Sequence, residues 1–432
     1  MSTIALATLI LIGSFFIMLA IGIEIMYALG FSAFITCWFL DMPISSVFQT
    51  MIGKISNTSL MAIPFFMLMG EFMSLGGISN RLVELANALV GWMRGGLAMV
   101  NCVDSMFFGG ISGSPVADCA SLGPILIPMM EKQGYHKEFA TGLTMSSSIE
   151  GMIIPPSHTM VIYAVTAGGV SIAGLYMGGI IAGVLLGVCL MVYSYIMAVK
   201  HNYPYGGKFS IKRIGKAMLD SIWGIIAMLI VVGGVFVGVM TATEAAAAAA
   251  LYCAIIAFFV TKEAKIRHLP GIFKRTIKAT ATVLFLASTA TAFSWIITYL
   301  KIPQAFASLL LGLTQSKFVL LLIINAILLV MGCFMNTSSV ILIMVPILLP
   351  VVQKFGMSPI QFGIMVVMNL GIGLLTPPVG SVLFIGSSIS GLSLEKVTKA
   401  VIPHLLAMLF ALMIVTYVPA VTTFLPKLFH FI

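Results

Sequence analysis

Long apolar segments, separated by short clusters of glycine, proline and polar residues, run along the whole chain. The apolar runs at 181–199 and 222–239 are continuous and do not alternate between apolar and polar positions. Alternation over about ten residues marks the strands of a membrane β-barrel, whereas about 20 continuous apolar residues cross a bilayer as a helix. The pattern therefore predicts an all-α polytopic membrane protein and excludes a β-barrel.

One segment, 95–130, is apolar, then polar, then apolar again. Each apolar arm is too short to cross a hydrocarbon core about 30 Å thick, so we expect a re-entrant hairpin with its tip at Ser112–Asp118. A helix over 139–168 follows. Pro155-Pro156 predicts an interruption of this helix at 150–157, because proline lacks a donor and restricts the residue before it.

The second half of the chain repeats this arrangement. Pro155-Pro156 and Pro377-Pro378 lie 222 residues apart. The same offset relates, without a gap, Gly110 to Gly332, Pro128 to Pro350, Gly134 to Gly356, Gly151 to Gly373 and Ser171 to Ser393. It predicts a second hairpin over 317–353, with its tip at Met335–Ser339, and a second helix interruption at 371–380. Paired segments of this kind are typical of secondary transporters, in which freed backbone groups near the bilayer midplane bind ions and substrate.

The other apolar segments predict spans of ordinary length. Residues 3–40 are expected to form one long or two short helices, broken near Gly22 and Gly30. Further helices are expected at 60–75, 172–199, 217–239, 243–261, 279–300 and 395–425, with an interfacial segment at 42–58 and an amphipathic one at 81–90. An odd number of spans before the second copy would make the two repeats inverted.

Charge is scarce and unevenly placed. Only 8% of the residues are charged, and half of the basic ones lie in two windows, 200–216 and 262–278. The apolar residues between the windows suffice for two spans of about 20 residues, so both windows lie on one side, which the positive-inside rule makes cytoplasmic. Topology thus explains the net charge of +9 without nucleic acid.

Two classes of site are not expected. The six cysteines are scattered through apolar segments, without a CxxC motif or a Cys/His cluster, so they are interpreted as packing residues rather than disulfides or metal ligands. No G-x-x-x-x-G-K-[ST] motif occurs, which favours transport driven by an ion gradient rather than by ATP.

Carboxylates inside apolar segments need a reason, because the bilayer makes them costly. Asp118 lies at a predicted hairpin tip beside Ser112 and Ser114, and such oxygen ligands suit a hard cation such as Na⁺. Alternatively, Asp118 caps the second hairpin arm. Glu150, at the first interruption, either lines a substrate cavity or hydrogen-bonds the unwound backbone. Glu244 is interpreted as part of a helix start.

The two interruptions are expected to act in the same way. The proline pairs push Ile154 and Thr376 out of the helical region, which frees carbonyls around 151–154 and 373–376. Each freed cluster is expected to face the hairpin of its own copy. Two such pairings predict two related cation sites with the substrate between them.

Six motifs, in order, carry a family resemblance over nearly the whole chain. They are Leu60-Met-Ala-Ile-Pro-Phe-Phe66 with Gly70-Glu71, Gly76-Gly77-Ile-Ser79, Ile111-Ser-Gly-Ser-Pro-Val-Ala-Asp118, Ile153-Ile-Pro-Pro-Ser157, Thr241-Ala-Thr-Glu-Ala245 and Leu375-Thr-Pro-Pro-Val-Gly380. Together they resemble the large membrane subunit of a tripartite ATP-independent periplasmic (TRAP) transporter. The resemblance implies an elevator-type, Na⁺-coupled importer in the bacterial inner membrane, with a fold like that of the ion-transporter superfamily. Its partners would be a small four-helix membrane subunit and a periplasmic binding protein that captures a carboxylate-bearing ligand.

The resemblance also implies roles for individual residues. Cation ligands would be Ser112, Ser114 and Asp118 with carbonyls near Gly151 and Pro155, and, in the second copy, Asn336 and Thr337 with carbonyls near Gly373 and Pro377. Candidate substrate contacts are Glu150, Ser157, His158 and Ser338. The sequence departs from the commoner family pattern at Glu150, where many relatives carry an apolar residue. Ser157-His158 favours sialic acid over a C4-dicarboxylate or another sugar acid.

An elevator implies a division into moving and static parts. The expected boundaries are 1–94 for N-terminal scaffold helices, 95–168 for the first transport elements, 169–278 for scaffold helices with basic loops, 279–316 for linking helices, 317–392 for the second transport elements and 393–432 for a C-terminal helix. The hairpins and broken helices would move together against the scaffold.

Two alternatives remain open. A stand-alone Na⁺-coupled anion carrier would transport without a binding protein. An intramembrane serine protease would use the GxSG match at Gly110–Gly113 with His158 as base. The 222-residue offset pairs Ser112 with Phe334 and His158 with Gly380, so the protease leaves the second copy without a role. An enzyme is therefore not expected.

Overall fold

The structure, a computed structural model, describes residues 3–377 and 380–431 of the chain. These residues form helices joined by short connections, without paired strands apart from an isolated bridge between Arg94 and Tyr205. Within the described part, eight helices are long and apolar enough to cross a membrane, or nine if a bent pair counts as one span. The prediction of an all-α polytopic protein is confirmed.

The residues before the first hairpin form α1 (Thr3–Ala20), α2 (Ile25–Phe39), α3 (Ile44–Ile55), a 3₁₀ turn (Thr58–Met61), α4 (Ala62–Leu75) and α5 (Ile78–Val90). The predicted break near Gly22 is confirmed, and the one near Gly30 is wrong. Gly30 lies inside α2, where an added Cβ would be 3.2 Å from Cγ2 of Thr289. Its missing side chain lets α2 pack closely against a later helix.

The first repeat contains a hairpin of α6 (Gly96–Ser112) and α7 (Pro115–Lys132), followed by α8 (Lys137–Ser147), α9 (Glu150–Ile153) and α10 (His158–Thr166). The hairpin turns at Gly113, whose φ of +59° favours glycine. Ile154 is extended between α9 and α10, so the predicted interruption before Pro155 is confirmed.

The second repeat has the same order of elements. It contains a hairpin of α17 (Lys317–Phe334) and α18 (Thr337–Lys354), followed by α19 (Pro359–Gly373), α20 (Ser381–Ser390), α21 (Leu394–Tyr417) and α22 (Pro419–Leu428). Pro378, in the second interruption, lies outside the described residues. The repeat extends to internal prolines, because α7 carries Pro124 and Pro128 where α18 carries Pro346 and Pro350.

The residues between the repeats form α11 (Ile172–Lys200), α12 (Ile211–Asp220), α13 (Ile222–Phe236), α14 (Ala242–Ile255) with a π turn (Ile256–Val260), a 3₁₀ turn (Ile266–His268), α15 (Leu269–Tyr299) and α16 (Ile302–Leu313). The span expected at 217–239 is instead the bent pair of α12 and α13, which meet at 66°. The helix expected from residue 279 starts earlier, at Leu269, so part of the second basic window is helical.

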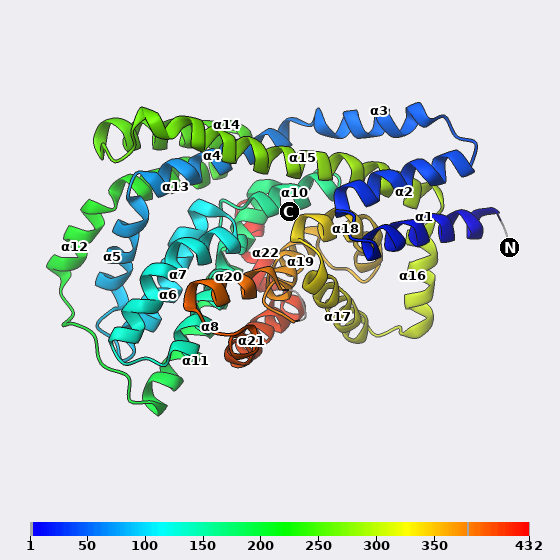
Figure 1. Cartoon of the computed structure of the whole chain (residues 1–432). Helices are drawn as coiled ribbons and strands as arrows, with labels where there is room; N and C mark the ends of the chain where they lie inside the picture. Colours follow the sequence, from blue (N-terminus) through cyan, green and yellow to red (C-terminus); the bar gives the residue numbers. More distant parts are fainter. Residues whose placement is uncertain (1–2, 378–379, 432) are drawn as a thin grey trace.

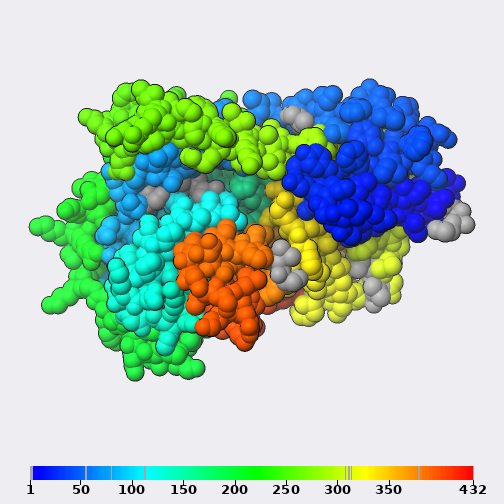
Figure 2. Space-filling view, in the orientation of Figure 1, coloured from blue at the N-terminus to red at the C-terminus, as the bar shows by residue number. Residues whose placement is uncertain are grey.

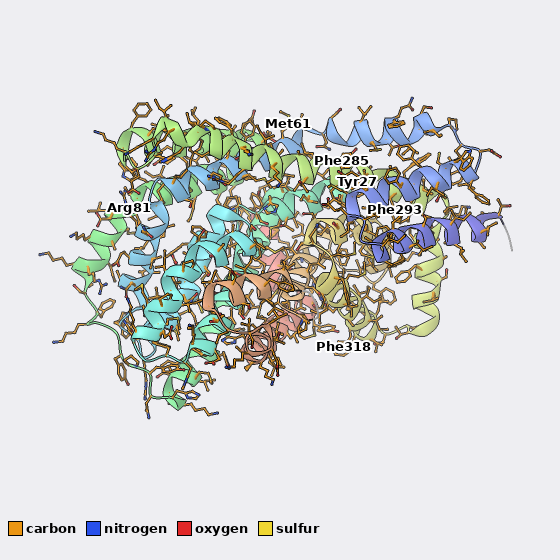
Figure 3. All side chains as sticks on the ribbon, in the orientation of Figure 1. Tyr27, Met61, Arg81, Phe285, Phe293 and Phe318 are labelled. Carbon is orange, nitrogen blue, oxygen red and sulfur yellow. The ribbon has the colours of Figure 1, made fainter. Side chains whose placement is uncertain are left out.

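Ion pairs hold the two basic windows on the same side of the molecule. Arg213, in the first window, lies 3.7 Å from Glu84, and Glu263, in the second, lies 3.6 Å from Arg81. Glu84 and Arg81 both belong to α5, at the edge of the molecule where Figure 3 labels Arg81. The common side inferred from the charge pattern is therefore confirmed, and positive charge marks it as cytoplasmic.

The two repeats are inverted. The first hairpin begins at the cytoplasmic side, where the Gly95 N–H donates to the Pro204 carbonyl of the first basic loop at 3.0 Å. α15 then crosses from the second basic window to the other side, and α16, with 12 residues, is too short to cross back. The second hairpin consequently enters from the side opposite to the first.

α11 packs against elements of both repeats. It contacts α6, α9 and α19, and also α21 and α22. α7 packs against α20, and Figure 2 shows these cyan and orange segments side by side. In Figure 1, α4, α14 and α15 lie along one flank of this group. The grouping could not be seen in the sequence, because apolar surface facing lipid resembles apolar surface facing protein.

Candidate functional site

The two hairpin tips and the two broken helices meet at a cavity of about 150 Å³, the central cavity. Its lining comes from 113–116 and 336–338 at the tips, from Met152, His158 and Thr159 beside the first interruption, and from Leu374 and Ser381 beside the second. Segments more than 200 residues apart in the sequence thus contribute equivalent elements to one site, as the offset predicts.

Each hairpin packs on the broken helix of its own copy through a pair of glycines. A Cβ added to Gly109 of α6 would lie 2.3 Å from Cα of Gly151 in α9. In the second copy, a Cβ added to Gly373 of α19 would lie 2.7 Å from Cα of Gly332 in α17. Backbone therefore touches backbone at both interruptions, and the predicted pairing of hairpin with interruption is confirmed.

Asp118 faces the first interruption from inside the protein. It is 1% exposed, and neither carboxylate oxygen has a hydrogen-bond partner among the described residues. A Cβ added to Gly151 would lie 3.9 Å from its Oδ2. The alternative that Asp118 caps α7 is wrong, because Ser114 is the cap and its Oγ accepts from the Ala117 N–H at 3.4 Å. A buried carboxylate without a partner is costly, so the site calls for a cation or a proton.

The other candidate cation ligands of the first repeat are Ser112, Ser114 and the carbonyl near Pro155, and their positions differ. Ser114 lines the central cavity, and Pro155 lies against the hairpin, with its carbonyl 3.0 Å from a Cβ added to Gly110. Ser112 ends α6, and its side chain lies outside the described part of the structure. The elements expected from the sequence thus meet: Asp118 lies close to Gly151, and Pro155 lies against the first hairpin.

Glu150 does not occupy either of its two expected positions. It is fully buried and is absent from the described lining of the central cavity. Its carboxylate oxygens lie 3.2 Å from a Cβ added to Gly187, so the side chain faces α11, and both oxygens lack hydrogen-bond partners among the described residues. Asp104, on α6, is buried and unpartnered in the same way. Asp118 thus lies within electrostatic range of two further carboxylates.

The remaining candidate substrate contacts separate into two kinds. Ser157 is structural: its hydroxyl donates to the Met152 carbonyl at 2.6 Å and accepts from the Met160 N–H at 3.3 Å, which caps α10. His158 and Ser338 line the central cavity from opposite copies. These two side chains are therefore placed to contact a ligand there.

The second repeat builds its tip without a carboxylate. Asn336 caps α18: its Oδ1 accepts from the Ser339 N–H at 2.9 Å and from the Ser339 hydroxyl at 2.7 Å. Asn336 and Thr337 line the central cavity. The interruption is tied to the hairpin by the Gly380 N–H, which donates to the Cys333 carbonyl at 3.3 Å. Pro377 lies in this connection, next to residues that the structure does not describe.

Comparison with known families identifies the architecture. Residues 12–421 match the model of the family described as "Tripartite ATP-independent periplasmic transporter, DctM component". The chain belongs to this family. It is the large permease subunit of a TRAP transporter and a multi-pass protein of the bacterial inner membrane. Family membership favours transport over the protease alternative.

Curated relatives cover most of this TRAP subunit. The C4-dicarboxylate TRAP transporter large permease protein DctM of Pseudomonas aeruginosa is 40% identical over 85% of this chain and 86% of its own length. The sialic acid TRAP transporter large permease protein SiaM of Vibrio cholerae is 37% identical over 88% of this chain and 89% of its own. Relatives named for different substrates thus match this chain at similar sequence identity.

The fold is also found in a solved structure. The YdaH transporter of Alcanivorax borkumensis, described as having an unusual topology, superposes with a TM-score of 0.63 over 86% of this chain and 88% of its own. Its sequence identity is 15%, so the likeness concerns the fold alone.

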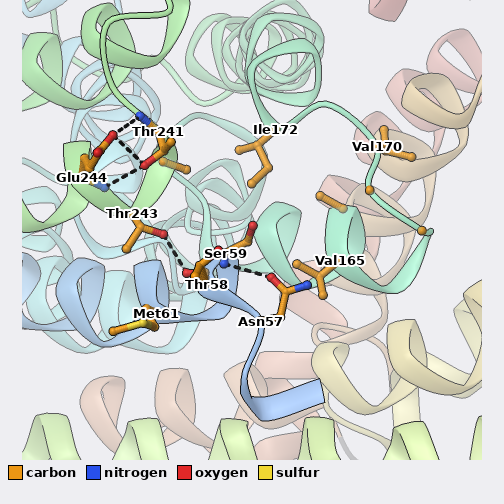
Figure 4. A pocket seen from close by; sticks show the side chains of 14 residues that line it. Asn57, Thr58, Ser59, Met61, Val165, Val170, Ile172, Thr241, Thr243 and Glu244 are labelled. Carbon is orange, nitrogen blue, oxygen red and sulfur yellow. Dashed lines mark hydrogen bonds between the residues drawn. The ribbon is translucent and has the colours of Figure 1, made fainter. Parts of the chain in front are cut away.

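A separate outer cavity of about 760 Å³ opens between the repeats and the flanking helices of the TRAP subunit, as Figure 4 shows. Its wall contains Thr241 and Glu244, whose Oε2 accepts from the Thr241 N–H at 2.7 Å and from the Thr241 hydroxyl at 2.9 Å. Thr243 donates to the Thr58 carbonyl at 2.9 Å. The interpretation of Glu244 as part of a helix start is confirmed by this capping box.

Proposed function

We propose that the chain is the membrane carrier of a Na⁺-coupled importer for a small carboxylate-bearing molecule. A small four-helix membrane subunit and a periplasmic binding protein complete the transporter. The observation that carries this proposal is the meeting of both hairpin tips and both interruptions around one cavity, the arrangement that lets freed backbone groups bind ions beside a substrate. Membership of a tripartite transporter family supports the partners.

Two Na⁺ sites flank the substrate in this proposal. The first uses Asp118, Ser112 and Ser114 with carbonyls near Gly151 and Pro155. The second uses Asn336 and Thr337 with carbonyls near Gly373 and Pro377. Asp118 supports the first site most directly, because its buried carboxylate has no other described partner. Oxygen ligands around one negative charge suit a hard cation.

The proposed substrate is a small molecule that carries a carboxylate. Ser157-His158 favours sialic acid, and His158 does line the central cavity. The cavity, at about 150 Å³, is below the usual range of about 300–1,000 Å³ for ligand pockets, which favours a smaller anion such as a C4-dicarboxylate. Sialic acid remains the first candidate from sequence, and both anions belong in the test.

Uptake should require a Na⁺ gradient and the binding protein. The large and small subunits are reconstituted in proteoliposomes, and labelled succinate or N-acetylneuraminate is presented on the periplasmic binding protein of the transporter. We expect accumulation with external Na⁺ and background uptake when K⁺ replaces Na⁺ on both sides. Full uptake in K⁺ would contradict Na⁺ coupling, and uptake without the binding protein would favour the stand-alone carrier.

The moving body of the proposed elevator consists of α6–α11 and α17–α22, and the static frame consists of α1–α5 and α12–α16. The packing of α11 on both repeats supports this division, which revises the boundary at residue 169. Substrate and ions are held between elements of both repeats, so these elements must travel together.

Spin labels can test the elevator. One label replaces Ser121 on α7 and the other Ser74 on α4, after removal of the native cysteines; both positions line a cavity between the two bodies. We expect the distance distribution to shift between Na⁺-free and Na⁺- plus substrate-bound protein. A control pair at Ser74 and Lys274, both in the frame, should stay constant. Equal constancy of both pairs would rule out the elevator and require a local gate.

A further inference from the structure

An inner cavity of about 310 Å³ adjoins the central cavity and contains an ion pair without a role in the transport proposal. Ser114 and His158 line both cavities. The opposite wall carries Glu71 of α4 and Arg275 of α15. Nε of Arg275 lies 3.0 Å from each Glu71 oxygen, and Nη2 lies 2.6 Å from Oε2. Glu71 belongs to a family-like motif that the proposed sites leave unexplained.

The inner cavity lies toward the cytoplasm. Arg275 is in the second basic window, and α4 ends near Glu263 of that window, because a Cβ added to Gly77 would touch the Glu263 carboxylate. Glu71 and Arg275 belong to the proposed frame, whereas Ala117 and Ser121 on the facing wall belong to the first hairpin. The inner cavity thus lies between the central cavity and the cytoplasmic side.

The ion pair is suited to exchanging its partner. The Arg275 side chain is 58% exposed and that of Glu71 27%, so the guanidinium is open to the cavity. Nε and Nη2 of Arg275 hold Glu71, so the N–H groups of Nη1 can still donate to a second carboxylate. A guanidinium also binds a carboxylate through two parallel hydrogen bonds, a geometry that lysine cannot offer.

We propose that Arg275 is a release subsite for the substrate carboxylate. The anion leaves the central cavity past Ser114 and His158 and pairs with Arg275 before it reaches the cytoplasm. Glu71 holds the guanidinium when the inner cavity is empty and, by competing for it, prevents the anion from being trapped. This inference rests on the proposed function, because it requires a carboxylate to move from the central cavity toward the cytoplasm.

The test measures binding from the inside. Proteoliposomes with the large and small subunits receive external Na⁺ and binding protein loaded with labelled succinate or N-acetylneuraminate, and they contain increasing concentrations of the same unlabelled anion. External binding protein restricts the signal to carriers in the correct orientation. The measured quantity is the internal anion concentration at which uptake falls to half. We expect Arg275→Gln to raise this concentration about tenfold, because a charge-assisted pair with the anion is lost. We expect Glu71→Gln to lower it, because Glu71 no longer competes for Arg275. Lys274→Gln, an exposed neighbour outside the described cavity lining, is the matched control and should change nothing.

A second variant separates binding from structure. The double substitution Arg275→Gln/Glu71→Gln removes both charges, so that neither is left unpaired, and should fold while keeping the weakened internal inhibition. If the double variant showed unchanged internal inhibition, the ion pair would only tie α4 to α15. If Lys274→Gln weakened the inhibition equally, the total positive charge of the region would be responsible. Either result would overturn the release subsite. Absence of Na⁺-dependent uptake by the wild type would overturn the proposed function, and this inference with it. Intact uptake with unchanged inhibition would overturn this inference alone.

Discussion

Replacing Asp118 by alanine is expected to abolish Na⁺-coupled uptake while the protein stays folded. The Asp118 carboxylate is buried, lacks a described hydrogen-bond partner and faces the interruption at Gly151. Removing one partner of a buried ion pair costs about 3–5 kcal/mol, which corresponds to a loss of more than about 100-fold in Na⁺ affinity. At ordinary Na⁺ concentrations the site would then be largely empty.

Stability measurements give this prediction an independent readout. A cation that binds only the folded state raises the midpoint of thermal unfolding, so Na⁺ should stabilise the wild type. In Na⁺-free buffer, Asp118→Ala removes an uncompensated buried carboxylate and should be at least as stable as the wild type. Na⁺ should then stabilise the variant less.

The controls distinguish a ligand from a general charge effect. Asp118→Asn keeps the shape of the side chain without its charge and should resemble Asp118→Ala. Asp220→Asn removes an exposed carboxylate at the end of α12 and should leave uptake and Na⁺ stabilisation unchanged. An unaltered Na⁺ titration in Asp118→Ala would exclude Asp118 as a ligand.

The sequence predicts the repeated elements well, because glycine and proline act through local backbone geometry. Proline ends a helix wherever it lies, so the interruption at Pro155 could be located without knowledge of any contact. Gly113 likewise supplies the positive φ of the hairpin turn. The 222-residue offset then transfers the interruption to the second copy, together with the glycine contact between Gly332 and Gly373. It does not transfer the positive φ, because Gly113 corresponds to Met335, which is extended.

Long-range choices between apolar surfaces could not be predicted. Lipid is as apolar as a packed helix face, so the pattern of α11 does not show that it packs on the repeats. The direction of Glu150 depends on the space left by Gly187, which only the folded packing reveals. The ion pair of Glu71 with Arg275 spans 204 residues, so neither residue indicates its partner in the sequence.

Gly109→Ala is expected to cause the largest loss of stability among the glycine substitutions at the interruptions. The added methyl group would lie 2.3 Å from Cα and 2.8 Å from N of Gly151. Both atoms are backbone, so relief requires the hairpin to separate from the broken helix. Overpacking on this scale costs about 3 kcal/mol or more, and the same displacement would open the Na⁺ site beside Asp118 and end transport.

The equivalent glycines of the second repeat allow a series of substitutions with graded effects on stability. A Cβ at Gly373 would lie 2.7 Å from Cα of Gly332, whereas the reverse substitution at Gly332 gives 3.2 Å. Destabilisation should therefore fall in the order Gly109→Ala, Gly373→Ala, Gly332→Ala. Gly215→Ala is the matched control, since an added Cβ in α12 meets nothing within 4 Å and alanine favours the helix by about 1 kcal/mol. Thermal unfolding in detergent and uptake in proteoliposomes measure both effects. A Gly109→Ala protein as stable and active as Gly215→Ala would show that the hairpin does not depend on this backbone contact.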